Sequence, residues 1–113
     1  MISLRDGFLE EAAAYEIGEL VRHRRYGYRG VVVAVTERFE GADEWYQKNQ
    51  TQPAKDQAWY HVLVHGSPSV TYAAQSSLEA DGSGAVVVHP LLEMFFSGFE
   101  EGRYLRNSVP WEL

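Results

Sequence analysis

The sequence predicts a mainly β domain, a small barrel of about five short strands followed by a short C-terminal helix. Three observations carry this prediction. Four valines in the five positions 31–35 form a β-branched run that suits a strand buried on both faces. Glycine-containing turns at 26–30, 66–68 and 81–84 separate the strand-like segments. The apolar period becomes helical only after His89-Pro90. Short strands with glycine turns are typical of SH3-like or OB-like barrels.

The length of 113 residues and the 45% hydrophobic content indicate one domain with a buried core. Residues 1–14 are interpreted as an N-terminal extension. Phe8, Leu9 and a run of alanines in the stretch 6–15 favour a short helical turn there. The barrel is predicted to span residues 15–89.

A long polar segment, 37–57, interrupts the strands. Loops of about 20 residues are unusual in a compact domain and are often functional. Trp45 and Tyr46 stand out as its large apolar anchors and are candidate contacts for a protein partner. The predicted strands are 17–22, 31–35, 58–65 and 69–74, with weaker candidates at 78–79 and 85–88.

The C-terminal segment, residues 90–113, is predicted to hold a short amphipathic helix and a tail. Between Leu91 and Gly98 the apolar residues recur at helical spacings. We expect this helix to pack against the barrel.

Charge is unevenly distributed along the chain. The formal net charge of −6 would repel polyanions at long range. Residues 20–38 nevertheless hold five arginines and one glutamate, whereas residues 76–113 hold six acids and two arginines. No cysteine is present, which excludes a disulfide scaffold or a thiolate metal site and fits a reducing compartment. No apolar run approaches the roughly 20 residues that cross a bilayer. We expect a cytoplasmic protein with no membrane partner.

The sequence contains no motif that would assemble a catalytic or metal-binding site. On an extended strand His61 and His65 would share a face, but at a separation of roughly 13 Å, too far to share a metal. The serines lie in turn-like segments and not in a nucleophile elbow. The adjacent acids Glu100 and Glu101 diverge in direction and suit a solvated tail. The sequence predicts no enzyme activity, no metal site and no cofactor.

The segment between residues 22 and 29, in which arginines alternate with aromatic residues, is the strongest functional candidate. Guanidinium groups beside aromatic rings suit phosphate contact combined with base stacking. The structural alternative is a hairpin whose solvated arginines protect a sheet edge from aggregation, while its tyrosines pack in the core or at the rim of the barrel. The candidate DNA-binding residues are Arg22, Arg24, Arg25, Tyr26, Tyr28 and Arg29.

A second candidate is a set of rings that could surround a methylammonium group through cation–π attraction: Trp45, Tyr46, Trp59, Tyr60 and Tyr72. Packing is the simpler interpretation for most of them. On one strand Trp59 and Tyr60 point to opposite faces, so both cannot line one pocket.

Three motifs resemble the YccV-like family, also called the hemimethylated-DNA-binding domain, which includes the bacterial heat-shock protein HspQ. They are 15–32 (YEIGELVRHRRYGYRGVV), 56–64 (DQAWYHVLV) and 71–75 (TYAAQ), and the resemblance covers about 15–104. The tail, with 89–92 (HPLL) and 96–99 (FSGF), is similar to the longer version found beside UVR motifs in plant proteins and at the end of an F-box protein.

The resemblance implies an SH3-like β barrel without catalysis and two alternative functions. The first is binding of DNA, including hemimethylated DNA, through the 22–29 segment. The second is a protein adaptor role in stress-linked proteolysis, in which the chain would contact a Lon-type ATP-dependent protease or its client proteins. A homo-oligomer is compatible with either function.

Overall fold

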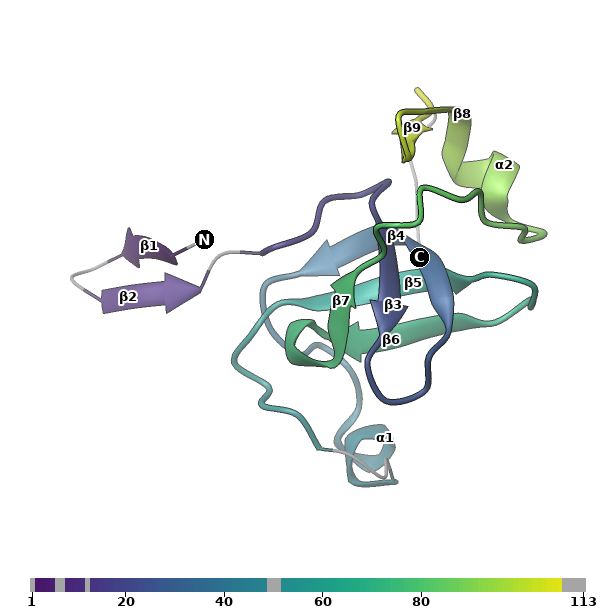
Figure 1. Ribbon diagram of the computed structural model, residues 1–113. Coiled ribbons are helices and arrows are strands. Elements are labelled where there is room, and N and C mark those ends of the chain that lie inside the picture. The colour runs from purple at the N-terminus through teal and green to yellow at the C-terminus, as the bar shows by residue number, and fades with distance from the viewer. Residues whose placement is uncertain (1, 6–7, 12, 49–51, 109–113) are drawn as a thin grey trace.

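The computed structural model describes the chain except residues 1, 6–7, 12, 49–51 and 109–113 (Figure 1). Its strands are β1 (Ile2–Arg5), β2 (Phe8–Glu11), β3 (Leu20–His23), β4 (Arg29–Thr36), β5 (Trp59–Val64), β6 (Val70–Ala74), β7 (Leu78–Ala80), β8 (Phe96–Glu100) and β9 (Arg103–Arg106). Its helices are α1 (Asp43–Lys48), the 3₁₀ turn η1 (Gln75–Ser77) and α2 (Leu92–Phe95). The described chain is mainly β, as the sequence predicts. No helix in the described ranges has the length and apolar character needed to cross a bilayer.

The central sheet has five antiparallel strands in the order β6-β5-β4-β3-β7. From β3 to β6 it is a meander, because each strand pairs with the next one along the chain. β7 then returns to the opposite edge and pairs with β3, placing Ala80 against Val21. Two further ladders, β1-β2 and β8-β9, are separate hairpins.

The two edge strands of this sheet are joined by η1 alone. A flat sheet of this size would hold its edges about 19 Å apart, because neighbouring strands lie about 4.8 Å apart. The four residue steps from Ala74 to Leu78 span at most about 14 Å. The sheet therefore curls until its edges approach each other at η1. No ladder joins β6 to β7 in the described part of the chain, so the sheet is open and a closed SH3-like barrel is not confirmed.

Buried side chains pack on both faces of the sheet. Val31 and Val33 belong to one cluster and Val32 to the other, which explains why these three valines are fully buried. The first cluster comprises Leu20, Val31, Val33, Leu63, Val87, Phe95, Phe96 and Tyr104. The second comprises Val21, Val32, Ala58, Tyr60, Val62, Ala73 and Leu78. Both faces of β4 are therefore core.

The C-terminal hairpin is fastened to the sheet at Gly18. Gly18 N–H donates to the carbonyl of Val32, and its own carbonyl accepts from Tyr104 N–H, both at 2.9 Å. Gly18 has φ +97°, and a Cβ there would lie 2.3 Å from the Tyr104 carbonyl oxygen. The Tyr104 hydroxyl in turn accepts from Val87 N–H at 2.8 Å and donates to the Val87 carbonyl at 3.1 Å. Glycine is required at 18 by both conformation and close approach.

The C-terminal helix is shorter than the sequence predicts. α2 is four residues long, and from Phe96 the chain is extended as β8. Glu101 and Gly102 have φ of 53° and 75°, the left-handed pair that a two-residue hairpin turn requires. The helical spacing arises because the bulge between Phe96 and Gly98 lets Phe96 and Phe99, three residues apart, both contact the Tyr104 ring on the partner strand.

Three other expectations also differ from the structure. In the N-terminal extension, residues 8–11 form strand β2 instead of a helical turn, while 6–7 and 12 lie outside the described residues. Residues 85–88 form no strand, because the carbonyls of Ala85 and Val86 accept hydrogen bonds from Arg29. The loop 37–57 contains the short helix α1.

Candidate nucleic-acid interface

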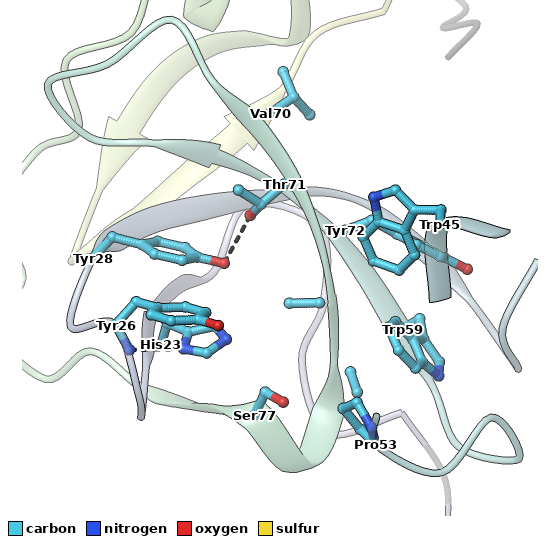
Figure 2. A pocket seen from close by; sticks show the side chains of 12 residues that line it. His23, Tyr26, Tyr28, Trp45, Pro53, Trp59, Val70, Thr71, Tyr72 and Ser77 are labelled. Atoms are coloured by element: carbon cyan, nitrogen blue, oxygen red, sulfur yellow. Dashed lines mark hydrogen bonds between the residues drawn. The ribbon is translucent and has the colours of Figure 1, made fainter. Parts of the chain in front are cut away.

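A groove of about 310 Å³ lies across the edge strand β6. Figure 2 shows its two walls: His23, Tyr26 and Tyr28 stand on one side, and Trp45, Trp59 and Tyr72 stand on the other. Thr71 and Ser77 line it between these walls, with Val70 at one end and Pro53 at the other. The groove is therefore aromatic on both sides.

The first wall is built by the turn between β3 and β4. His23 Nδ1 accepts hydrogen bonds from the backbone N–H groups of Arg25 (3.2 Å) and Tyr26 (3.1 Å), which ties the turn to the buried imidazole. The His23 ring stacks on Tyr26 at 4.6 Å and lies 5.1 Å from Tyr28. Gly27, with φ +75°, lets the chain reverse. Tyr28 is fixed across the groove by a 2.8 Å hydrogen bond between its hydroxyl and that of Thr71.

Burial lowers the pKa of His23, and the nearby charge of Arg25 lowers it further. The neutral imidazole is also the form that accepts the two turn hydrogen bonds. The pKa of His23 is lower in the folded than in the unfolded protein. Its contribution to stability is therefore fully present above the unfolded pKa of about 6.5. It is lost as the pH falls from that value through the lower pKa of the folded protein.

We therefore expect His23 to titrate below pH 6.5, as measured by NMR from its Cε1–H shift. Burial also lowers the pKa of His61, so the pH dependence of stability has two contributions. Between pH 7.5 and 5.5, a His23→Gln variant should lose less free energy of unfolding than the parent protein, as measured by urea unfolding. A His23 pKa at or above 6.5 would contradict the neutral turn.

The predicted DNA-binding arginines do not share one surface. Arg29 Nε lies 2.6 Å from Asp81 Oδ2, and its side chain is 18% exposed. Arg22, the cross-strand partner of Arg29, reaches Asp81 Oδ1 at 3.5 Å. The Asp81 side chain is fully buried. Arg29 is therefore held in a largely buried ion pair with Asp81, whereas Arg22, whose side chain is 47% exposed, makes a longer contact with the same carboxylate from the surface.

Arg24 and Arg25 remain on the exposed turn beside the groove. Arg24 donates its Nε–H to the carbonyl of Leu78 at 3.0 Å, which orients its guanidinium along the β7 edge. The guanidinium of Arg25 lies 5.8 Å from the ring centroid of Tyr26. Tyr26 itself is 55% exposed. Of the predicted set, the structure brings Arg24, Arg25 and Tyr26 together at the surface, with Tyr28 behind them.

The second wall is part of an aromatic cluster around Phe39. The Phe39 ring lies 5.0–5.9 Å from the rings of Trp45, Tyr46, Trp59 and Tyr72. Trp45 is 41% exposed, whereas Tyr46 donates its hydroxyl to the carbonyls of Gln52 and Pro53 and so braces the loop. Of the two predicted partner contacts, Trp45 lines the groove and Tyr46 is structural.

Sequence reasoning missed the groove because its walls come from distant segments. Phe39 was not singled out, although it organises the loop between residues 37 and 57. His23 was not among the predicted site residues, although it anchors the first wall of the groove. The expected opposition of Trp59 and Tyr60 is confirmed, because Tyr60 packs in the second core cluster while Trp59 faces the groove. Within the described residues, no three His, Cys, Asp or Glu side chains converge on a metal position.

Comparisons with known proteins bear on this arrangement. A family model described as "YccV-like: Hemimethylated DNA-binding protein YccV like" matches residues 13–103. F-box only protein 21 of Homo sapiens is 29% identical over 110 residues, which cover 95% of this chain and 17% of that protein. The corresponding protein of Pongo abelii is 29% identical, with 95% and 18% covered. The chain thus spans less than a fifth of the length of these relatives.

Proposed function

The chain belongs to the YccV-like family of hemimethylated-DNA-binding proteins, and from that premise we propose that it binds duplex DNA through the turn 24–28 and the aromatic groove beside it. The observation that carries this proposal is the position of Arg24 and Arg25 on an exposed turn that also forms a groove wall. Phosphate contacts from this turn would hold the duplex while the groove meets a base edge. The comparisons give no support to the protease-adaptor alternative, and we do not propose it.

The electrostatic contribution should be small. Each neutralised phosphate contributes about −0.9 to the slope of log K against log salt. Four arginines would give a slope near −3.6, but Arg22 and Arg29 share the Asp81 carboxylate and do not lie on the turn 24–28. The two arginines of the turn predict a slope of about −2. Binding to DNA should therefore be weak and only moderately sensitive to salt.

Discrimination of a methyl mark would come from apolar contact in the groove. Burying one methyl group contributes about 0.8 kcal/mol, which corresponds to a roughly fourfold preference. The exposed rings of Tyr26 and Trp45 and the side chain of Val70 supply the apolar surface. A fourfold preference is small, so selective recognition of a methylated site would need further contacts outside this groove.

Fluorescence anisotropy with matched duplexes tests the proposal. Unmethylated, hemimethylated and fully methylated duplexes carrying N6-methyladenine or 5-methylcytosine would be titrated at several salt concentrations. We expect Arg24→Gln to weaken binding severalfold and to reduce the salt slope by about one. Arg103→Gln is the matched control, because it removes the same charge from an exposed pair with Glu16 away from the turn. Equal losses in the two variants would show that net charge and not this turn governs binding.

A further inference from the structure

A second hollow, of about 410 Å³, lies on the other side of the aromatic wall. It shares Trp45 and Tyr72 with the groove and is completed by Thr36, Glu40 and His61, together with the backbone at 41–42. The ring of His61 lies 4.5 Å from that of Tyr72 at an interplanar angle of 30°, and Trp45 lies 6.1 Å from Tyr72 at 54°. The hollow is therefore lined by three rings from β5, β6 and α1.

The rings of this hollow are held in place. The Tyr72 hydroxyl accepts the backbone N–H of Glu40 at 3.0 Å and shares a 2.7 Å hydrogen bond with the hydroxyl of Thr36. His61 Nδ1 is covered and has no hydrogen-bond partner, so this atom is not presented to a ligand. A ligand in the hollow would meet ring surface more than hydrogen-bonding groups.

The electrostatics of the hollow favour a cation. Glu40 lies close enough to His61 for its charge to raise the pKa of the imidazole, although burial is the larger effect and lowers that pKa. The lowered pKa favours the neutral imidazole at pH 7, and Glu40 is the acidic side chain among the described lining residues. Negative ring faces and a carboxylate act on a cation in the same direction.

The same aromatic cluster already holds one ammonium group. Lys55 Nζ lies 5.4 Å from the ring centroid of Phe39 and 4.5 Å from that of Tyr46. It also lies 2.8 Å from Asp43 Oδ1. Two ring faces and one carboxylate therefore bind an ammonium group at Phe39, and Phe39 contacts both Trp45 and Tyr72 of the hollow. The hollow repeats this chemistry with its own rings and Glu40.

We propose that the hollow is a binding site for an N-methylated ammonium group, held by the rings of Trp45 and Tyr72 and by the carboxylate of Glu40. A primary ammonium carries three N–H donors that need acceptors, and Glu40 is the accessible charged acceptor among the lining side chains. A trimethylammonium group carries no donor and presents apolar, positively charged methyl groups to the rings. This activity goes beyond DNA binding and does not depend on it.

NMR titration of the full chain tests the site, with the Trp45 indole N–H and the His61 ring as reporters. The probes are choline, the N-acetyl amide of trimethyllysine, the same amide of unmodified lysine, and 3,3-dimethyl-1-butanol, the neutral isostere of choline. We expect both trimethylammonium probes to shift the reporters and both the neutral isostere and unmodified lysine to bind at least about tenfold more weakly. Tighter binding of trimethyllysine than of choline would identify a protein tail as the source of the group, and the reverse order a free or headgroup choline.

Variants locate the binding. Glu40→Gln should weaken the trimethylammonium probes severalfold while leaving the rings in place. Glu44→Gln is the matched control, because it removes an exposed acid from the neighbouring helix α1 outside the hollow. Trp45→Leu should abolish the response of the His61 reporter. Equal binding of the neutral isostere, or equal effects of the two glutamate variants, would overturn the proposal.

Discussion

An Asp81→Asn variant is expected to lose about 3 kcal/mol of unfolding free energy, because the substitution leaves two arginines facing each other without their counter-ion. Arg22 and Arg29 are direct cross-strand partners on β3 and β4, where like charges destabilise a sheet. Asp81 contacts both and also accepts hydrogen bonds from Ser83 N–H and Oγ–H. We expect a loss at the lower end of the range measured for broken buried pairs, because the side chain of Arg29 is 18% exposed and that of Arg22 is 47% exposed.

The pH dependence of Asp81 has a definite sign. Burial alone would raise the pKa of this carboxyl, but the hydrogen bonds from Arg29 and Ser83 outweigh it and hold the pKa below its usual value. Its contribution is therefore present above the unfolded pKa of about 3.9 and is lost as pH falls through the lower folded value. The parent should lose this stability in acid, and the variant should not.

Urea unfolding followed by tryptophan fluorescence measures both effects. Asp43→Asn is the control, since the pair of Asp43 with Lys55 is solvent-exposed and should leave the unfolding midpoint nearly unchanged. Equal destabilisation by the two substitutions would mean that the buried cluster contributes no more than a surface pair.

A Gly18→Ala variant is expected to lose at least about 2 kcal/mol of stability and to release the C-terminal hairpin from the sheet. The new Cβ would lie 2.3 Å from the Tyr104 carbonyl oxygen, and neither backbone can move without breaking the hydrogen bond between Tyr104 N–H and Gly18. Loss of that contact should increase hydrogen exchange at β9 and at Val87, which the Tyr104 hydroxyl holds.

Gly66→Ala separates the two causes. Gly66 also has a positive φ, of 74°, but a Cβ there meets no atom within 4 Å. It should therefore show only the conformational cost of roughly 1 kcal/mol and normal exchange in the hairpin. If the two variants are equally destabilised, the approach of Gly18 to Tyr104 carries no energetic weight.

Strand positions were predictable where the local pattern alone decides them. The strand at the valine run, the strand predicted at 58–65 and found at Trp59–Val64, and the opposition of Trp59 to Tyr60 all follow from side-chain alternation and turn residues. The turn at 81–84 was also predictable, and its aspartate bonds locally to Ser83 as such turns do.

What escaped prediction depends on contacts between distant segments. The charge count at 20–38 could not show that Arg29 is neutralised by a residue 52 positions away. The groove could not be inferred either, because it requires knowing that β6 is an edge strand with the β3–β4 turn on one side and α1 on the other. Periodicity failed after α2 because a bulged strand can place rings three residues apart on one side, as Phe96 and Phe99 do against Tyr104, and so imitate a helical face.

The connection through η1 leads us to expect an order of events during folding. β3 to β6 can assemble by successive hairpins, but β7 docks on β3 across a separation of about 60 residues, once those strands already lie side by side. The amides of β7 should then be the last of the sheet to gain protection after dilution from denaturant. Because Arg24 and Asp81 flank this last pairing, the surface of the turn would reach its final form only when the sheet is complete.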